Sequence, residues 1–320
     1  MSTARNTLRL RVLGSGAGGG LPQWNCGCPP CRSARAGDGR VRTRTQSSLA
    51  VSADGERWVL LNASPDVRVQ LAAWPAAAPA EGVLRASPIA ATVLTNADLD
   101  HCLGLLILRE GGAPHIFATE PTFEAIEKGL GVLTALAAYG PTKSTTLPID
   151  QREVAITDRD GVDTGVRVRA FAVTSKVPPY AQARGLGAQR GELDGDTIGL
   201  LVRSKDSDRW LAYVPGVREL DERLAGFLSQ ASTIFIDGTF WRQDEMTSMG
   251  LTTRDAKVMG HAPLSGPEGI IAFLARFSGA NRWLVHINNT NPIHFEQGAE
   301  RRECEAAGVR VSYDGLELDV

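Results

Sequence analysis

Three of the five cysteines in this 320-residue chain lie within six positions. Cys26, Cys28 and Cys31 have the spacing C-x-C-x-x-C, and the glycine and two prolines between them predict a turn that brings the sulfurs together. Thiolates at this spacing can bind one soft ion such as zinc. In a reducing compartment such a cluster is more typical of a metal site than of a disulfide framework, and the odd number of cysteines agrees. We therefore predict a structural zinc ion with a fourth ligand from elsewhere; buried or merely reactive thiols are the alternative.

A second group of candidate ligands follows the apolar segment 91–94, which has the composition of a buried strand. Asp98, Asp100 and His101 lie in the sequence Thr-Asn-Ala-Asp-Leu-Asp-His immediately after it. A strand end can direct several short side chains into one cavity, and an oxygen-rich ligand set suits iron or manganese as well as zinc. The alternative for Asp100 is that it caps the helix predicted after His101. We predict that these residues contribute to a second metal site.

Polar residues also end predicted strands in the C-terminal half of the chain. Asp237 follows an apolar run, and His261 and His286 stand at strand ends or in the loops beside them. Because the chain has only five histidines, two in such positions carry more weight than a random pair. A lone histidine is more often a hydrogen-bonded structural group. We assign that role to His115, which opens a strand-like segment, and leave His294 unassigned.

The composition is that of a globular protein with no strongly charged partner. Hydrophobic residues make up 43% and charged residues 22%, and the formal net charge of −2 does not favour nucleic acid or an anionic membrane. No run reaches the roughly eighteen apolar residues of a membrane helix. The first residues also lack the apolar core of a secretory signal. We therefore expect a cytoplasmic protein with no membrane span and no nucleic-acid partner.

Strand-like segments recur along the whole chain, separated by turns that contain glycine or proline. The predicted strands are 8–13, 48–52, 58–61, 91–95, 166–173, 197–202, 210–214, 233–236, 282–286 and 309–313. Helical periodicity follows His101 and covers 121–137, 219–229 and 267–277. This order predicts an α/β (α+β) protein with two sheets packed face to face and covered by helices. Residues 1–320 are expected to form one domain with pseudo-equivalent halves at about 7–160 and 161–320.

Two further segments are predicted to be loops. The glycine-rich run 14–20 follows a strand, but no Lys-Ser or Lys-Thr pair comes after it and no helix begins there. It is therefore interpreted as a turn rather than a phosphate-binding loop. The alanine- and proline-rich segment 74–88 is interpreted as a loop or insertion, and no linker divides the chain.

Three strings of residues carry a resemblance to a known family. They are Gly-Gly-Gly-Leu-Pro-Gln-Trp-Asn-Cys at 18–26, Asp-Leu-Asp-His-Cys-Leu-Gly-Leu-Leu at 98–106 and His-Ile-Asn-Asn-Thr-Asn-Pro at 286–292. Together they resemble the B family of pyrroloquinoline quinone (PQQ) biosynthesis, within the metallo-β-lactamase superfamily. The similarity runs from about Arg9 to the C-terminus. It implies the metallo-β-lactamase αββα sandwich, with two mixed sheets flanked by helices.

The resemblance implies metal-binding roles for several polar residues. The superfamily signature H-x-H-x-D-H corresponds to residues 96–101, where Asp100 and His101 match metal ligands. Asn96 and Asp98 stand where the signature has histidines. His286 occupies the position of the superfamily's final metal-binding histidine. The resemblance therefore implies a site formed by Asp98, Asp100, His101 and His286.

Two other assignments follow from the same resemblance. Asp237 and His261 resemble an acid–histidine pair, in which the carboxylate orients the imidazole for proton transfer. In relatives with the cysteine cluster, a histidine three residues beyond the final metal-binding histidine completes the zinc site, and Asn289 stands at that position. Asn289, His294 and a water molecule are therefore the candidates for the fourth zinc ligand.

The chain also departs from the hydrolases of the superfamily. Their aspartate that bridges two metals has no counterpart, because the corresponding segment reads Ala-Tyr-Val-Pro-Gly around Tyr213. A histidine expected near Lys176 is also missing. A dinuclear hydrolytic centre needs such ligands. We therefore expect one metal, or a second one bound weakly, and no ordinary hydrolysis of β-lactams, thioesters or phosphodiesters.

Three functions are compatible with these features. The first is an iron-dependent oxygenase that hydroxylates a tyrosine-derived peptide precursor of PQQ, as the family resemblance implies; its imidazole and carboxylate ligands suit a mononuclear Fe²⁺ site. The second is a carrier that transports PQQ or its precursor to the periplasm, which the altered metal motif favours. The third is a metal-dependent hydrolase, which is supported by the fold alone. Other proteins of the PQQ pathway are further candidate partners.

Five arginines follow the cysteine cluster, and their guanidinium groups suit the carboxylates of an acidic ligand. They are Arg32, Arg35, Arg40, Arg42 and Arg44. A solvated basic loop is an equally good interpretation of each of them.

Overall fold

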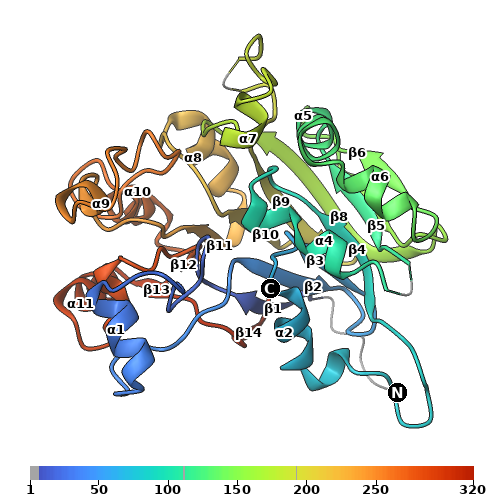
Figure 1. Cartoon of the computed structure of the whole chain (residues 1–320), viewed down its shortest axis with the longest axis horizontal. Helices are drawn as coiled ribbons and strands as arrows, with labels where there is room; N and C mark the ends of the chain where they lie inside the picture. Colours follow the sequence, from blue (N-terminus) through green and yellow to red (C-terminus); the bar gives the residue numbers. More distant parts are fainter. Residues whose placement is uncertain (1–6, 111, 192) are drawn as a thin grey trace.

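Two mixed seven-stranded sheets pack face to face in the computed structural model, which describes residues 7–110, 112–191 and 193–320. Helices cover the outer surface of each sheet, so the layers follow the order helix, sheet, sheet, helix (Figure 1). The predicted αββα sandwich is therefore confirmed.

Each sheet is parallel on one side and antiparallel on the other. The first sheet consists, in spatial order, of β14 (Glu317–Asp319), β1 (Arg9–Gly14), β2 (Ser48–Ser52), β3 (Trp58–Leu61), β4 (Ile89–Val93), β5 (His115–Ala118) and β6 (Ser144–Thr146). The second consists of β13 (Val309–Val311), β12 (Asn281–Val285), β11 (Ala231–Asp237), β10 (Trp210–Val214), β9 (Ile198–Ser204), β8 (Asp163–Ala172) and β7 (Val154–Thr157). Within the first sheet, neighbouring strands from β3 to β6 run parallel. Within the second sheet, neighbouring strands from β10 to β13 run parallel.

Helices and single turns lie outside the sheets and at the ends of the strands. The helices of the described residues are α1 (Pro29–Ala36), α2 (Val67–Ala72), α3 (Leu99–Cys102), α4 (Gly104–Ile107), α5 (Glu120–Glu124), α6 (Val132–Ala137), α7 (Pro179–Gln182), α8 (Glu222–Leu228), α9 (Glu245–Ser248), α10 (Ile270–Leu274) and α11 (Ala299–Ala306). The short turns are η1 (Pro75–Ala77), η2 (Ala125–Gly129), η3 (Ala275–Phe277) and η4 (Pro292–His294). None of the described helices is long and apolar enough to cross a membrane.

Alternation along the strands explains why both faces of each sheet are covered. In β3, Val59 and Leu61 belong to the apolar core between the sheets, whereas Trp58 and Leu60 pack in a cluster with residues of α2. Successive side chains of a strand point to opposite faces, so a strand that is apolar throughout must be covered on both sides. The uninterrupted apolar runs of the central strands therefore require the outer helices.

The predicted strands agree with the structure to within a few residues, but two local predictions are wrong. A single helix over 121–137 is excluded, because η2 is a π-helical turn and Gly131, with a φ of 69°, separates it from α6. Pro29 and Pro30 begin α1 instead of forming a turn. Proline fits the first turn of a helix, where its missing N–H would have had no intrahelical partner.

Parallel strands from both sheets end at one edge of the sandwich. β4 ends at Val93, β11 at Asp237 and β12 at Val285. The loops that follow these strands carry the candidate ligands, and Figure 1 shows these strands in the middle of the molecule, between the two groups of helices. The sandwich therefore brings polar residues from distant parts of the chain to one place.

Candidate active site and cysteine cluster

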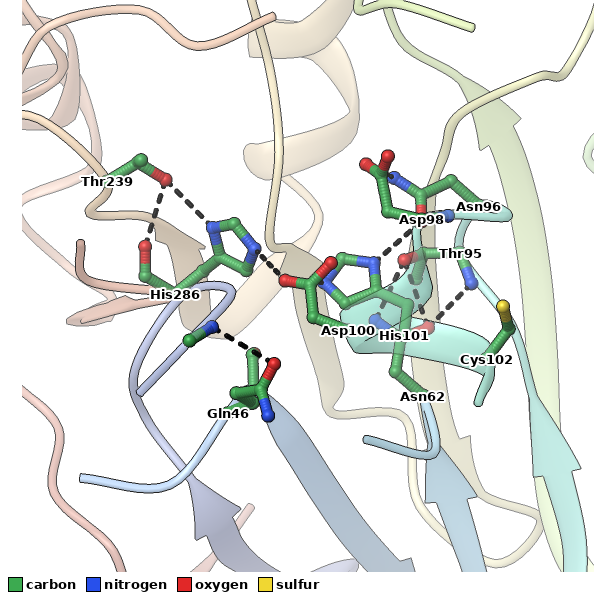
Figure 2. A network of polar contacts seen from close by, with 12 residues as sticks. Gln46, Asn62, Thr95, Asn96, Asp98, Asp100, His101, Cys102, Thr239 and His286 are labelled. Atoms are coloured by element: carbon green, nitrogen blue, oxygen red, sulfur yellow. Dashed lines mark hydrogen bonds and ion pairs between the residues drawn. The ribbon is translucent and has the colours of Figure 1, made fainter. Parts of the chain in front are cut away.

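The side chains of Asp100, His101 and His286 meet where loops from the two sheets face each other (Figure 2). Asp100 Oδ2 lies 3.1 Å from His286 Nε2 and 3.9 Å from His101 Nε2. The two imidazole rings are 5.1 Å apart between centroids. Two nitrogens and one carboxylate oxygen thus lie within 4.8 Å of one another, close enough to ligate a single ion after small adjustments.

His101 offers an unused nitrogen to this group. The residue lies in α3 and is 1% exposed, and its Nδ1 lies 2.7 Å from Asn96 Oδ1, which fixes the orientation of the ring. Its Nε2 is buried and has no hydrogen-bond partner among the described residues. A buried polar atom without a partner costs free energy unless a ligand or ion occupies it. This nitrogen is therefore suited to hold a metal ion.

His286 is held from its other side by Thr239. It follows β12 with a φ of 58°, a conformation that is uncommon for a residue with a side chain. Its Nδ1 lies 2.8 Å from Thr239 Oγ1, and that hydroxyl lies 2.6 Å from Asp237 Oδ1. A hydroxyl that donates to the carboxylate can accept a hydrogen bond from Nδ1–H of the imidazole. This arrangement directs Nε2 toward Asp100 and makes it available to a metal.

The charges within this group favour a cation. Burial would raise the pKa of Asp100, but the nearby His101 and the hydrogen bond from His286 lower it, so the carboxylate is ionised. Burial lowers the pKa of His101 to about 4, which keeps its imidazole neutral. Burial would also lower the pKa of His286, but the hydrogen bond with Asp100 raises it. A metal ion that binds here replaces the proton on His286 Nε2.

Asp98 lies outside this group, although the sequence predicts it as a ligand. It stands at the N-cap position of α3, and its Oδ2 accepts a hydrogen bond from Asn96 Nδ2 at 3.0 Å. Its Oδ1 lies 3.9 Å from the ammonium group of Lys176. The alternative that Asp100 caps the helix is wrong, because its carboxylate contacts His286 instead. Asp98 therefore acts on the site through Asn96.

Asp237 and His261 lie side by side next to the same group. His261 Nδ1 is 2.6 Å from Asp237 Oδ2, and its ring stacks on His286 with centroids 5.3 Å apart. Burial would raise the pKa of Asp237, but the charge and hydrogen bond of His261 lower it, so the carboxylate is ionised. An ionised Asp237 favours the tautomer of His261 with its hydrogen on Nδ1. In this tautomer Nε2 of His261 carries no hydrogen and can exchange a proton with a ligand.

No role was predicted for Thr239 and Asn62, which connect these segments. Thr239 Oγ1 contacts Asp237, His261 and His286, at distances of 2.6 to 3.1 Å. Asn62 follows β3, and its side chain bonds Thr95 through both Oδ1 and Nδ2, at 2.8 and 2.9 Å (Figure 2). Both residues follow apolar strands, and that position is the only sequence signal that could have identified them.

The sulfurs of Cys26, Cys28 and Cys31 converge at the N-terminal end of α1. They lie within 4.8 Å of one another, and sulfurs around a tetrahedral zinc ion are about 3.8 Å apart. Asn289 Nδ2 lies 3.1, 3.5 and 3.4 Å from the three sulfurs in that order. An amide flip that exchanges the oxygen and nitrogen of Asn289 would direct the oxygen toward the space between the three sulfurs, where it could be the fourth ligand of an ion. Three thiols and an amide oxygen fit a zinc ion.

His294, the alternative fourth ligand, does not face the cysteines. Its Nε2 donates to the carbonyl of Asn288 at 2.8 Å, and its Nδ1 accepts from the buried Arg44 at 3.1 Å. Burial and the charge of Arg44 lower its pKa well below the usual value, so the ring is neutral. Both nitrogens are used, and His294 is structural. His115 is also structural, because it bonds Thr145 Oγ1 at 2.8 Å and backbone carbonyls.

The arginines after the cluster hold their own loop and its neighbours together. Arg44 is buried and donates to Ser15 Oγ at 2.7 Å. The others bind nearby groups: Arg32 the carbonyl of Gly27, Arg35 the carbonyls of Gln23 and Cys26, Arg40 the carboxylate of Asp38, and Arg42 that of Glu296. The interpretation that these guanidinium groups receive a ligand carboxylate therefore loses its support.

Replacement of Cys28 by alanine should remove zinc and lower the melting temperature together. A thiolate ligand of a closed site contributes part of the metal's folding free energy. We expect a decrease of roughly 5–10 °C, the shift that a loss of about 3 kcal/mol produces in a large domain. Zinc content by elemental analysis and thermal unfolding would test this. Cys304→Ala is the matched control, because Cys304 is buried but lies outside the cluster; full zinc content in Cys28→Ala would show that the site is misassigned.

Glu245 supports the loop that carries His286 and Asn289. It is 2% exposed, accepts a hydrogen bond from Thr290 Oγ1, and accepts another from the backbone N–H of Trp241 at 2.6 Å. Burial raises the pKa of Glu245 to about 7, because the charged form loses its hydration. At pH values between the ordinary pKa of a glutamate and about 7, Glu245 is therefore mainly protonated in the folded protein.

The pH dependence of stability should change in Glu245→Gln. In the wild-type protein, the contribution of Glu245 is fully present below pH 4.5, the usual pKa, and is lost as pH rises toward about 7. Glutamine does not ionise, so the stability of the variant relative to wild type should rise across this range, by roughly 3 kcal/mol at most. Urea unfolding at several pH values would measure the difference. A difference that does not vary with pH would contradict the prediction.

Comparison with known proteins gives consistent matches to one family. The chain matches the beta-lactamase superfamily domain over residues 57–287. It is 42% identical, over 97% of its length and 99% of the relative's, to coenzyme PQQ synthesis protein B of Methylococcus capsulatus. It is 40% identical to the protein of the same name in Pseudomonas aeruginosa, over 98% of this chain and 100% of the relative.

A solved structure gives the same result. The crystal structure of Zn²⁺-bound PqqB from Methylobacterium extorquens has a TM-score of 0.86 with this chain and 41% sequence identity. The similarity covers 98% of this chain and 100% of that one. The Methylobacterium protein binds Zn²⁺ in that crystal structure. In this chain, three of the arrangements described above bring potential metal ligands together: the cysteine cluster, the group of Asp100, His101 and His286, and the group of Asp237, His261 and His286.

Proposed function

The chain belongs to the PQQ synthesis protein B family of the metallo-β-lactamase superfamily, and on that premise we propose that it is an iron-dependent oxygenase in PQQ biosynthesis. Its substrate in this proposal is a tyrosine-derived peptide precursor of PQQ. The observation that carries the proposal is the group of Asp100, His101 and His286, because two imidazoles and one carboxylate form the ligand set of mononuclear iron oxygenases. A ferrous ion held by these residues would supply the activation of dioxygen.

In our proposal the glycine-rich turn keeps space beside Asp100 for small molecules. Gly18 lies against this carboxylate, and a Cβ atom at position 18 would be 3.4 Å from Asp100 Oδ2. Any longer side chain there would cover the approach to the ligand group. The glycine-rich turn therefore contributes to the site by keeping space beside the carboxylate, and not by binding a phosphate.

A cavity lined by the segment that follows β8 would receive part of the substrate, although Asp100, His101 and His286 do not line it. It has a volume of about 100 Å³, and its lining includes Ser175, Lys176 and Arg190. Lys176 also lies 3.9 Å from Asp98, so it connects the cavity to the loop of the ligand group. A precursor derived from tyrosine and glutamate carries carboxylates, and the Lys176 ammonium group offers a charge of opposite sign.

Proton transfer is the part of the reaction that the chain's own residues would perform. Hydroxylation inserts one oxygen atom of dioxygen into a ring C–H bond and reduces the other to water. The balance requires two electrons from an external one-electron reductant and two protons. In our proposal His261 passes protons through Nε2, and Asp237 stabilises the charged form of the ring.

A hydrolytic function is less well supported than an oxygenase. Tyr213 is fully buried, and its hydroxyl lies 3.3 Å from Ser47 Oγ and 3.5 Å from Asn62 Nδ2. Burial raises the pKa of its phenol, which therefore stays neutral. A neutral phenol does not replace the carboxylate that bridges two metals in a dinuclear site. A single ion with open positions is the arrangement that these residues support.

We also propose that the protein works in the cytoplasm. A reducing environment keeps Cys26, Cys28 and Cys31 as thiols that can bind zinc. Exchange of the precursor or product with other proteins of the PQQ pathway would take place in the same compartment.

Single-turnover product analysis tests the proposal. The protein is loaded with ferrous ion without oxygen, mixed with the tyrosine-containing precursor peptide, and then given dioxygen and ascorbate as the reductant. We expect oxygen consumption and a peptide product that has gained one oxygen atom, measured by mass spectrometry. Binding of the quinone or precursor without any hydroxylated product would overturn the oxygenase and support the carrier instead.

A further inference from the structure

We propose that the zinc-bound cysteine cluster positions His286, and that Asn289 couples the cluster to the ligand group of Asp100, His101 and His286. Occupancy of the cysteine cluster would then raise the affinity of the second group for its own metal. This inference rests on the proposed function, because it takes both clusters as metal sites.

One short loop after β12 reaches both clusters. His286 Nε2 lies 3.1 Å from Asp100 Oδ2, while Asn289, three positions later, places its Nδ2 within 3.5 Å of all three sulfurs. In the metal-free cluster the Cys28 thiol also donates to the carbonyl oxygen of Asn289 at 3.3 Å, and zinc binding replaces this bond because the Cys28 thiolate has no proton to donate. A change in the cysteine cluster therefore acts on the backbone that carries His286.

The backbone at His286 needs such support. Its φ of 58° is a left-handed conformation that is unfavourable for a residue with a Cβ atom. The conformation holds only while the surrounding loop fixes it. Ile287 N donates to the carbonyl of Ser15 at 3.0 Å, and Asn288 N donates to that of Thr239 at 3.1 Å. The carbonyl oxygen of His286 also lies 2.9 Å from Thr239 Oγ1, and that of Ile287 accepts from Ala17 N at 2.9 Å; the residue after Asn288 is Asn289 at the cysteine cluster.

Several bonds of the loop do not depend on zinc. Asn291 Nδ2 donates to the carbonyl of Gly238 at 2.9 Å, and His294 donates to that of Asn288. These bonds keep the loop close to its place when the cluster is empty. The coupling should therefore be partial: loss of the Asn289 link weakens metal binding at His286 by about tenfold, within the usual range of coupling between two sites.

The mechanism of the coupling is preorganisation. A ligand on a loop that is fixed at both ends loses less conformational freedom when it binds a metal. Linkage also requires reciprocity, so a metal bound at the ligand group should raise the affinity of the cysteine cluster for zinc by the same factor.

Iron binding to zinc-loaded full-length variants tests the coupling. Anaerobic equilibrium dialysis against ferrous ion, with bound iron and zinc measured by elemental analysis, is compared for wild type, Asn289→Ala and Asn289→Asp. We expect Asn289→Ala to bind iron about tenfold more weakly, and Asn289→Asp to recover most of the loss because its carboxylate can hold both zinc and the loop. Arg35→Ala is the matched control, since Arg35 binds the cysteine segment through the carbonyls of Gln23 and Cys26.

A second measurement covers the case in which Asn289→Ala does not fold. The rate of zinc loss from the wild-type cysteine cluster to a competing chelator is measured with and without ferrous ion at the ligand group. Slower loss in the presence of iron, and no such effect in His101→Ala, would support the coupling. Equal rates would overturn it.

The outcomes separate this inference from the proposed function. If wild type binds no iron at Asp100, His101 and His286, the proposed function fails and the coupling fails with it. If wild type binds iron tightly and Asn289→Ala binds it equally tightly, the coupling is overturned while the proposed function stands.

Discussion

Replacement of His101 by alanine should abolish iron binding at the ligand group and lower hydroxylation by more than about 100-fold. Changes to residues that merely support a metal ligand already cost about 10- to 100-fold, so loss of a ligand should cost more. The variant also removes the buried Nε2 that lacks a partner among the described residues. Iron content after anaerobic loading and product formation in single turnover measure the two effects.

His115→Ala is the matched control for His101→Ala. His115 is a buried histidine that bonds Thr145 and the carbonyls of Thr157 and Asp158 at the other end of the parallel strands. Its loss should reduce stability and leave iron binding unchanged. Zinc at the cysteine cluster should stay in both variants. Full iron content in His101→Ala would exclude the proposed ligand group.

The residues of the two candidate clusters could be predicted where they are close in the sequence. Cys26, Cys28 and Cys31 lie within six positions, so their convergence needs only a local turn. Asp100 and His101 are neighbours at the end of an apolar segment, which identifies a strand end without knowledge of the fold. His286 lies in the other half of the chain, and only the family resemblance connected it with them.

Asp98 could not be distinguished from Asp100 by sequence. Asp98 has an extended backbone, with a φ of −61° and a ψ of 145°, because α3 begins at the next residue. Asp100 already lies in the first turn of that helix. The change of backbone conformation between them turns the carboxylates toward different partners, Asn96 for one and His286 for the other. The exact start of a helix is among the features that a sequence determines least well.

The exchange of strands between the halves could not be predicted either. β7, from the first half of the chain, is an edge strand of the second sheet, and β14, from the end of the chain, is an edge strand of the first. Val154 pairs with Val168, and Leu318 pairs with Leu10. These pairings depend on which sheet has an edge free for a short strand, and a local apolar pattern carries no information about that.

Replacement of His261 by alanine should slow turnover by roughly 10²- to 10⁴-fold, the range for loss of a general acid–base group. The imidazole is placed for proton transfer, because it stacks on His286 and its Nδ1 is fixed by Asp237 at 2.6 Å. His261 forms a separate group of potential ligands with Asp237 and His286, but it is not a ligand in the proposed group around Asp100, so in our proposal the iron and zinc contents stay unchanged. Single-turnover product formation by the iron-loaded variant measures the effect.

Asp237→Asn provides a second test of the same pair. An asparagine amide in that place can donate to the imidazole, which would reverse the tautomer of His261 and turn a nitrogen without hydrogen toward the amide. The rate should therefore fall in this variant while the imidazole remains. Comparable losses in the two variants, with metal content unchanged, would support proton transfer through the pair. Turnover within about tenfold of wild type in His261→Ala would assign the proton to another group, and a change in precursor binding alone would favour the carrier.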